Sequence, residues 1–328
     1  MKKYLTIFCL ITLGIMTFLA FLPEKEESDL TKINVAEVAH SIFYAPQYAA
    51  DALGYFEEEG LDVEFILTSG ADAVSAAVLS GDIEIGFAGS ESTIYIYNGG
   101  EEDYLVSFAG LTKRDGSFIV SREYIEDFTL DDLIDSHVIA GRVGGMPVMT
   151  FEYTLSEYGI DSTNDLYVDT SIDFASMAGA FISGTGDFVN LFEPQATLVE
   201  SQGFGYVVAS LGELGGVVPY TSYNAKKSYI EDNPEVIEGF SNAIQKGIDF
   251  VLENNSEDIA DIIIDYFPDT SLSDLVSIID RYKEADSWFD TTYITEEDFN
   301  LVQDIMINSG ELEEYVDYSK LVTTEFAN

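Results

Sequence analysis

Apolar and polar residues follow two periods along most of the chain, one typical of strands and one typical of helices. Residues 33–38 alternate apolar and polar side chains, which predicts a strand. Pro46 then opens a helical stretch that ends at Gly60, as expected for proline in a first turn and glycine after a last one. The pattern continues with strands at 62–67, 83–87 and 104–111 and helices at 71–80 and 90–98. This order predicts a mostly parallel sheet with right-handed crossovers.

A second unit of the same kind begins near Arg122. Its pattern predicts strands at 137–140, 166–168, 189–192 and 206–210 and helices at 148–158 and around 176–181. After Pro219 the pattern predicts helices only, at about 233–254, 256–266, 271–285 and 295–309. We therefore expect an α/β fold of two lobes, the first formed by residues 32–121 and 214–328 and the second by 122–213. The cleft between such lobes is the expected ligand site, and hinge closure is the expected motion.

The first residues have the pattern of an export signal. Lys2 and Lys3 precede an uncharged run over residues 4–22, and an acidic segment over 23–31 follows. As a helix, this run is about long enough to span the hydrocarbon core of a bilayer. Basic residues before it and acidic residues after it predict that the body of the chain is exported. The run is either a cleaved signal peptide or an uncleaved anchor that tethers the protein to the membrane.

Composition then excludes several classes of protein. The 328 residues include 14 Lys and Arg and 60 Asp and Glu, so the formal charge is 14 − 60 = −46. Nucleic-acid binding needs cations and is excluded, and docking of the folded part on anionic lipid is disfavoured. The single cysteine, Cys9, lies in the first apolar run, and His40 and His137 are the two histidines. We therefore expect no metal site, no cysteine nucleophile and no cofactor.

Five sequence blocks, taken together and in order, resemble a known family. The first is His40-Ser41-Ile42-Phe43-Tyr44-Ala45-Pro46-Gln47-Tyr48-Ala49-Ala50 with Gly54-Tyr55-Phe56-Glu57-Glu58-Glu59-Gly60-Leu61-Asp62-Val63. The others are Leu79–Gly86, Asp115–Val120, Gly144–Pro147 and Phe192–Pro194. They resemble the SsuA-like and NMT1-like solute-binding proteins of ABC importers for nitrate, sulfonate, taurine and thiamine pyrimidines. The resemblance implies a periplasmic-binding-protein type II fold and a permease partner, and we expect a monomer.

Three glycine-rich or strand-end loops supply most candidate ligand contacts. They contribute His40, Ser41, Phe43 and Tyr44 after the first strand, Gly89, Ser90 and Glu91 after the third, and Gly144, Gly145 and Met146 in the second lobe. Backbone N–H groups at helix starts bind polar groups, and glycine lets the backbone approach a ligand closely. The alternative interpretations are aromatic packing for the first loop and a simple helix cap for the second.

Charged and aromatic residues complete the candidate set. Glu193 follows a strand that reads as buried, where it either accepts hydrogen bonds from an amino group of a ligand or forms a salt bridge across the lobe. Lys113 and Arg114 either hold an anion or pair with nearby carboxylates, and the second interpretation suits so acidic a chain better. The remaining candidates are Phe174, Phe192 and Tyr220, which can stack on a planar ligand, and Asp187 in a glycine-rich turn.

These observations lead to one main hypothesis and three alternatives. The main one is an extracytoplasmic solute-binding protein that is not an enzyme and binds a small planar nitrogen-containing solute, such as a thiamine-pyrimidine precursor. A sulfonate-like or nitrate-like anion is the alternative ligand. An enzyme related to pyrimidine synthases of this fold is disfavoured because those carry a cysteine-rich segment. A membrane-tethered sensor is disfavoured because no signalling module is evident in the sequence.

Overall fold

The first of two five-stranded sheets is mixed, although four of its strands run in the same direction. The computed structural model describes residues 30–328, and the expected leader and most of the acidic linker lie outside this range. The strand order is β2-β1-β3-β10-β4. The strands are β1 (Thr31–Glu37), β2 (Leu61–Leu67), β3 (Ile85–Gly89), β4 (Leu105–Thr112) and β10 (Thr221–Lys226). Strand β1 is parallel to β2 and β3, whereas β10 is antiparallel to both β3 and β4.

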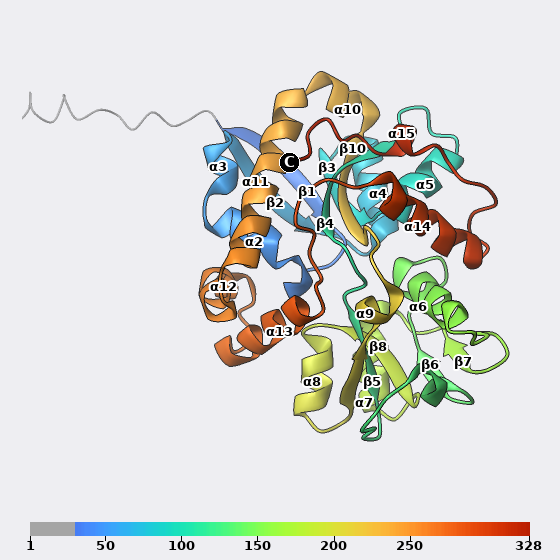
Figure 1. Ribbon diagram of the computed structural model, residues 1–328. Helices are drawn as coiled ribbons and strands as arrows, with labels where there is room; N and C mark the ends of the chain where they lie inside the picture. Colours follow the sequence, from blue (N-terminus) through green and yellow to red (C-terminus); the bar gives the residue numbers. More distant parts are fainter. Residues whose placement is uncertain (1–29) are drawn as a thin grey trace, which may run out of the picture. The chain divides into compact units, whose positions relative to one another are not determined.

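Helices from both ends of the sequence surround this sheet (Figure 1). They are α2 (Ala45–Ala52), α3 (Tyr55–Glu58), α4 (Ala71–Ser80), α5 (Glu91–Asn98), α10 (Lys227–Asp232), α11 (Pro234–Glu253) and α15 (Tyr318–Leu321), with a 3-10 turn η1 (Ile42–Tyr44) after β1. Helix α11 buries Ile237, Phe240, Ile244, Ile248 and Val251, a spacing that places apolar side chains on one helical face. This face packs against α2, α3 and β4.

The second sheet has the strand order β7-β6-β8-β5-β9. Its strands are β5 (Ser117–Ser121), β6 (His137–Ile139), β7 (Tyr167–Asp169), β8 (Phe188–Phe192) and β9 (Tyr206–Ser210). Its helices are α6 (Met146–Glu157), α7 (Met177–Ile182), α8 (Gln195–Ser201) and α9 (Leu211–Gly215), with 3-10 turns η2 (Leu130–Leu133) and η3 (Phe174–Ser176). We call the part built on the first sheet lobe 1 and the part built on the second sheet lobe 2.

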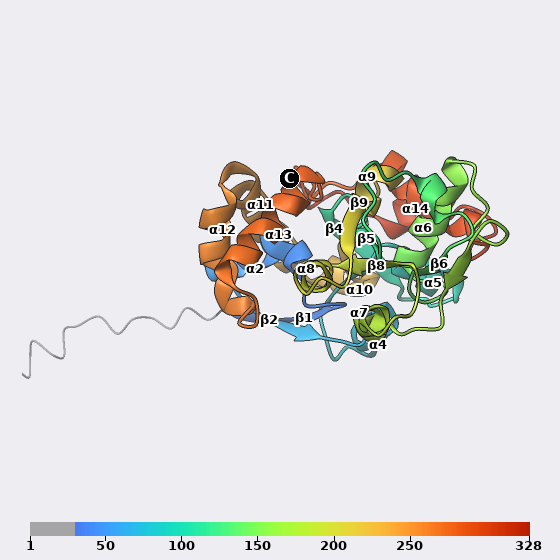
Figure 2. The ribbon, with the colours of Figure 1, turned by 90° about the horizontal axis from the view of Figure 1, so that it is seen from below.

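The remaining helices of these two lobes follow α11 in the sequence. They are α12 (Ser256–Ile263), the 3-10 turn η4 (Ile264–Tyr266), α13 (Leu272–Glu284) and α14 (Glu296–Asn308). Helix α12 packs on α2, and α13 packs on α12 and η1, so both belong to lobe 1. Helix α14 contacts α5 of lobe 1 and α6 of lobe 2. Figure 2 shows α12 and α13 on one side of residues 30–328 and α6 and α14 on the other.

The chain crosses between the lobes at two neighbouring segments. It leaves β4 through residues 113–116 to enter β5, and it returns from β9 through α9 and residues 216–220 to enter β10. The two segments are hydrogen-bonded to each other, from Val218 N to Lys113 O at 2.9 Å and from Tyr220 N to Thr112 O at 2.9 Å. Such a paired crossing is a natural hinge.

Most elements agree with the sequence pattern, and two expectations were wrong. The chain after Pro219 is not purely helical, because β10 lies in the middle of the first sheet. The expected mostly parallel direction of the first sheet is present, since β10 is the one strand that runs against the other four. Strand β5 pairs with β8 and β9 in the second sheet, although the sequence division placed residues 117–121 in the first lobe. Among the residues described, no helix is both long and apolar enough to cross a membrane.

Candidate functional site

The loops that the sequence singled out meet where the two lobes face each other. The carboxyl ends of β1, β3 and β4 approach those of β6 and β8, as expected for a ligand site in open α/β sheets. Contacts between the lobes confirm this arrangement. Tyr95 of α5 donates a hydrogen bond to Gly144 O at 3.1 Å, and Ser41 donates one to Glu193 O at 3.1 Å. The site is therefore assembled from both lobes.

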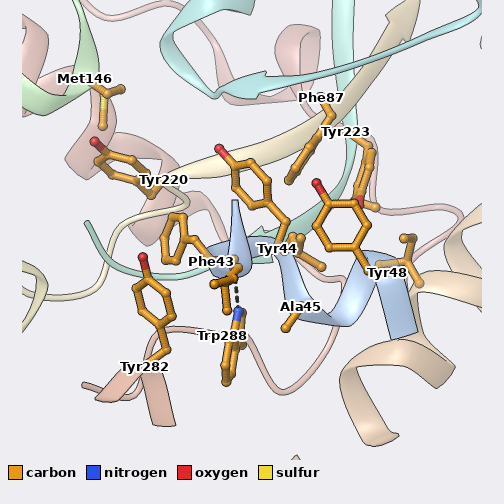
Figure 3. Close-up of a cluster of buried hydrophobic side chains, with 14 of the residues drawn as sticks. Phe43, Tyr44, Ala45, Tyr48, Phe87, Met146, Tyr220, Tyr223, Tyr282 and Trp288 are labelled. Atoms are coloured by element: carbon orange, nitrogen blue, oxygen red, sulfur yellow. Dashed lines mark hydrogen bonds between the residues drawn. The ribbon is translucent and has the colours of Figure 1, made fainter. Parts of the chain in front are cut away.

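Aromatic rings from both lobes cluster at the centre of this site, and Figure 3 shows Phe43, Tyr44 and Tyr220 of this cluster with Met146 of lobe 2 nearby. Phe43 is fully buried, and its ring centroid lies 5.5 Å from that of Tyr44, 5.8 Å from Phe192 and 6.1 Å from Tyr220. Phe174 is 51% exposed and lies 5.6 Å from Phe192. The sequence thus selected five aromatic residues that the structure brings together. Phe43 itself is packed on all sides, as its alternative interpretation proposed, while Phe174 has a free face.

Asp115 and Tyr220 each leave a polar atom without a partner beside these rings. Asp115 Oδ1 accepts hydrogen bonds from Ser117 N at 2.7 Å and Ser117 Oγ at 2.5 Å. Its buried Oδ2 and the buried Tyr220 hydroxyl have no hydrogen-bond partner at normal distance in the described chain, but the two groups are neighbours, and the Tyr220 hydroxyl lowers the pKa of Asp115 in opposition to burial. Burial raises the pKa of Asp115 to about 6, and burial together with Asp115 raises the pKa of Tyr220 well above its ordinary value. Figure 3 shows the Tyr220 hydroxyl directed towards Met146 of lobe 2.

Glu91 is a second buried carboxylate with a free oxygen. It is the first residue of α5 and is only 4% exposed, and its Oε2 has no hydrogen-bond partner in the part of the chain described. Burial raises the pKa of Glu91 to about 7, although the N–H groups of Glu91 and Met146 and the charge of Arg142 oppose this rise. Gly89 makes room for the carboxylate, since a Cβ at residue 89 would lie 2.0 Å from Glu91 Oε2. A side chain at residue 89 would therefore require the Glu91 carboxylate to move.

Lys113 and Arg114 lie at the lobe crossing, and neighbouring carboxylates hold both of them. Lys113 Nζ lies 2.9 Å from Asp286 Oδ1 and 3.6 Å from Asp290 Oδ1. Arg114 Nη2 lies 3.2 Å from Asp286 Oδ2, and its Nη1 donates to Gly212 O at 3.4 Å. This is the pairing with carboxylates that the sequence analysis favoured. Neither side chain is available as a free cation for an anionic ligand.

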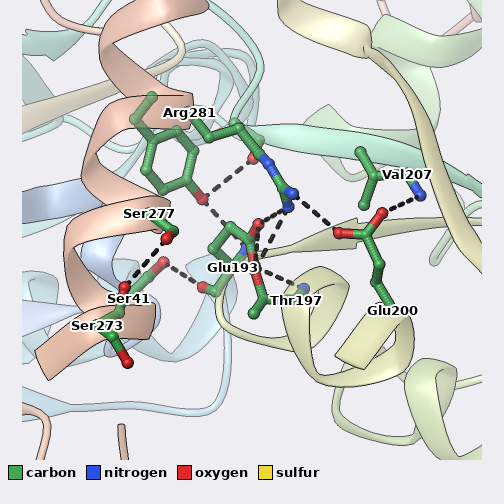
Figure 4. Close-up of polar contacts among 10 residues, drawn as sticks. Ser41, Glu193, Thr197, Glu200, Val207, Ser273, Ser277 and Arg281 are labelled. Atoms are coloured by element: carbon green, nitrogen blue, oxygen red, sulfur yellow. Dashed lines mark hydrogen bonds and ion pairs between the residues drawn. The ribbon is translucent and has the colours of Figure 1, made fainter. Parts of the chain in front are cut away.

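Glu193 is held by an ion pair between the lobes and is not a free acceptor (Figure 4). Its side chain is fully buried and pairs with Arg281 of α13, while Thr197 donates to it from N at 2.8 Å and from Oγ1 at 3.0 Å. Arg281 also contacts Glu200 Oε2 at 3.0 Å. The expected role of Glu193 as an acceptor for an amino group needs a free oxygen, and these contacts occupy both. The salt bridge proposed as the alternative is what the structure contains.

The other selected residues divide between the cleft and positions away from it. His40 lies in lobe 1, where Nδ1 contacts Glu37 at 3.0 Å and Nε2 contacts Tyr266 O at 2.8 Å. The hydrogen bond to Glu37 is the main cause that raises the His40 pKa. The Ser90 hydroxyl donates to Pro219 O at 2.5 Å and to Ser222 Oγ at 3.0 Å, so it ties α5 to β10. Both residues thus have structural contacts within lobe 1.

Asp187 was expected either to face the cleft or to cap a turn, and the structure places it at the end of β8 away from Glu193. It precedes β8, whereas Glu193 follows that strand, so the two lie about 20 Å apart at roughly 3.3 Å per residue. Asp187 Oδ2 accepts a hydrogen bond from His137 N at 2.9 Å at this distant end of lobe 2. The glycine-rich turn there serves to align β6 and β8.

Two functional residues escaped the sequence analysis. Asp115 was part of a quoted block, and its Asp-Gly-Ser context at a lobe boundary is the signal that would have identified it. Arg281 lies 88 residues after Glu193 in the sequence, and only the fold brings them together. Within residues 30–328, no group of three or more His, Cys, Asp or Glu side chains has an arrangement that could hold a metal ion.

The two lobes have the fold of the periplasmic-binding-protein type. A crystal structure of the periplasmic aliphatic sulphonate binding protein SsuA from Escherichia coli superposes with a TM-score of 0.70, at 18% identity over 89% of this chain and 97% of the other. The Candida albicans CA3427 gene product, described as exhibiting the generic periplasmic binding protein structural fold, gives a TM-score of 0.65 at 14% identity, over 90% and 97% of the two chains. These structures confirm the expected fold class.

Sequence comparison identifies the family. The family model described as "NMT1/THI5 like" matches residues 42–258. A Bacillus subtilis (strain 168) protein named "Putative binding protein YtlA" is 44% identical over 303 residues, which cover 92% of this chain and 91% of the relative. The chain belongs to the NMT1/THI5-like family.

Proposed function

We propose that the protein is the extracytoplasmic solute-binding component of an ABC importer and that it binds a small, planar, nitrogen-containing organic solute. A thiamine-pyrimidine precursor is the favoured member of this class. The solute would lie between the lobes beside Tyr44, Phe192 and Tyr220, and the lobes would close on it by bending at the paired crossing segments. The solute would then pass to a membrane permease.

One observation supports this ligand class above all: two buried carboxylates at the site have oxygens without partners. A buried polar atom without a hydrogen bond costs about 1–3 kcal/mol, and more when it is charged. A ligand that carries N–H donors supplies the missing partners for Asp115 Oδ2 and Glu91 Oε2. Aromatic rings beside them provide faces on which a planar heterocycle can stack.

An anionic ligand such as a sulfonate or nitrate is less well supported. The structural resemblance to a sulphonate-binding protein is at 18% identity and concerns the fold. Lys113 and Arg114, the cations expected to hold an anion, are engaged by Asp286. An anion would also meet the free carboxylate oxygens of Asp115 and Glu91, and like charges at close range repel strongly in a buried site.

A binding role is also better supported than catalysis. The 44% identical relative is named as a binding protein, and its match covers nearly the whole of both chains. The carboxylates Asp115 and Glu91 and the guanidinium of Arg142 are charged groups of the site, and neither histidine lies beside them, since both histidines make other contacts. The proposal therefore assigns recognition and release of a solute to the site.

A ligand panel tests the proposal on the full-length protein. Thermal unfolding would be followed with thiamine-pyrimidine precursors, riboflavin, taurine, an alkyl sulfonate and nitrate. A ligand at 100 times its dissociation constant adds about 2.7 kcal/mol to the free energy of unfolding, which such a measurement detects. We expect a pyrimidine to raise the melting temperature and the anions to leave it unchanged.

Matched variants locate the binding. Asp115→Asn keeps an acceptor for Ser117 but removes the charge, and it should weaken a pyrimidine by about tenfold or more. Asp187→Asn removes the same charge at the distant end of β8 and should leave the affinity unchanged. Stabilisation by a sulfonate or nitrate, with none by a pyrimidine, would show that the ligand class is wrong.

A further inference from the structure

A separate cavity opens beside the central site, between the first-lobe helices α4 and α5 and the loop before α6. Its volume is about 220 Å³. A cavity of about 150 Å³ holds a benzene ring, so this one has room for a ring with a short substituent. The residues that line it are Ala71, Asp72, Ser75, Ala76, Leu79, Glu91, Ser92, Tyr95, Ile96, Arg142 and Gly144. We call this cavity the side pocket.

The charges around the side pocket favour a cation. Three charged side chains line it, with Asp72 and Glu91 negative and Arg142 positive, so their formal sum is −1. Arg142 Nη1 and Asp72 Oδ2 lie 3.3 Å apart in a pair that joins the lobes, and both side chains are largely exposed. An exposed pair of this kind contributes little to stability and can separate easily. Arg142 is therefore shared between Asp72 and Glu91, and its charge offsets only part of the burial that raises the pKa of Glu91.

Glu91 connects the side pocket with the aromatic centre. Its charge helps burial to raise the pKa values of the Tyr44 and Tyr220 hydroxyls, so Glu91 acts electrostatically on the aromatic centre. It also lines the side pocket, and its Oε2 has no partner in the chain as described. The remaining wall is mostly apolar and formed by small side chains, notably Ala71, Ala76 and Leu79. One carboxylate thus lines the side pocket and also acts on the aromatic centre.

We propose that the side pocket is a second subsite of the cleft and that it receives an amine-bearing arm of the solute, whose N–H groups donate to Glu91. This assignment rests on the proposed function, because it assumes that the cleft binds a nitrogen-containing solute. The apolar wall would cover the carbon skeleton of the arm. Gly89 is part of the subsite because it leaves space for the Glu91 carboxylate.

A pair of small probes tests the charge requirement. Benzylamine and benzyl alcohol differ in one polar group, and the amine is protonated at neutral pH. Binding to the full-length protein would be measured by calorimetry or by NMR line broadening. We expect benzylamine to bind more tightly than benzyl alcohol, and Glu91→Gln to weaken benzylamine by about tenfold while changing benzyl alcohol little. Glu314→Gln removes the same charge from an exposed position and should alter neither.

A second pair of variants tests the location without changing a charge. Ala76→Leu fills the side pocket from an exposed position on α4, so it should fold normally and abolish benzylamine binding. Ala73→Leu lies on the same helix outside the lining and should leave binding intact. Benzylamine affinity that is unchanged by both Glu91→Gln and Ala76→Leu would overturn the subsite.

The outcomes also separate this proposal from the function on which it rests. Suppose that a pyrimidine binds and that Asp115→Asn weakens this binding, while Glu91→Gln and Ala76→Leu leave the affinity for benzylamine unchanged. The central site then stands and the side pocket is not a subsite. If instead an anion from the panel binds and no pyrimidine does, the proposed function fails first. Preferential binding of an alkyl sulfonate that Arg142→Gln abolishes would assign the side pocket to an anion and overturn the inference.

Discussion

Glu91 shows how one residue can carry both a cost to folding and a role in binding. A buried carboxylate that lacks a full set of partners destabilises the folded state when it is ionised. Its pKa is raised to about 7, compared with an ordinary value of 4.5. The folded protein therefore binds this proton more tightly than the unfolded chain does. The contribution to stability is favourable at low pH and is lost as the pH rises from about 4.5 to 7.

Glu91→Gln should consequently stabilise the ligand-free protein at pH 8 and have little effect at pH 5, where Glu91 is protonated. We expect a gain of about 1–3 kcal/mol in the free energy of unfolding at pH 8. The rise of the Glu91 pKa corresponds to about 3 kcal/mol, and the cost of burying the glutamine amide reduces the gain. Urea unfolding at both pH values measures this difference. Glu314→Gln corrects for the loss of one charge from a very acidic chain, and an equal gain in both variants would contradict the prediction.

The site was predicted from the sequence to the level of loops but not of individual atoms. Strand ends and glycines selected Tyr44, Glu91 and Met146 as candidate contacts, and in the structure the Met146 N–H and the Tyr44 hydroxyl both interact with the Glu91 carboxylate. Glu193 was recognised as a buried carboxylate, yet its partner Arg281 lies on a distant helix. A pairing of this kind depends on how helices pack around the lobes, which the local pattern does not contain.

At the scale of elements, the composition of β10 explains why the sequence pattern predicted no strand after Pro219. Its sequence is Thr-Ser-Tyr-Asn-Ala-Lys, and serine and asparagine are weak strand formers. Strand β10 is nevertheless buried between β3 and β4, because hydroxyl groups satisfy one another there. Ser222 Oγ contacts Ser90 Oγ at 3.0 Å and Ser107 Oγ at 3.1 Å. Central position and polar pairing together override the weak local preference.

The contact of α11 with α2 makes a second element-scale prediction. A Cβ at Gly247 would lie 2.2 Å from Pro46 O, so an alanine would force the two helices apart. Gly247→Ala should therefore destabilise the protein by about 1–3 kcal/mol, the usual cost of overpacking, despite the higher helix propensity of alanine. A Cβ at Gly179 in α7 would meet no atom within 4 Å, and Gly179→Ala should be neutral or stabilising. Chemical unfolding of both variants makes the comparison, and equal effects would refute it.

For lobes 1 and 2 taken together, Arg281 links the separation of the lobes to the free energy of unfolding. It projects from α13 of lobe 1 to Glu193 and Glu200 of lobe 2. Two further contacts across the same boundary are hydrogen bonds from Ser41 to Glu193 O at 3.1 Å and from Glu193 N to the Tyr282 hydroxyl at 3.2 Å. Glu193 is fully buried, so in the closed arrangement its charge depends on Arg281. Removing the guanidinium leaves a buried charge whose best relief is to open the lobes and admit water.

Arg281→Met, which keeps a long apolar stem, should lower the free energy of unfolding by about 3–5 kcal/mol, the cost of breaking one half of a buried pair. Small-angle scattering should show a larger radius of gyration for the ligand-free variant. Adding Glu193→Gln should recover most of both effects, because the unbalanced charge is then gone. Lys246→Met breaks a more exposed pair within lobe 1 and should cost less than about 1 kcal/mol. A loss for Arg281→Met no greater than for Lys246→Met would mean that the lobes are held closed by apolar contacts such as α14 on α6, and that Arg281 only covers Glu193.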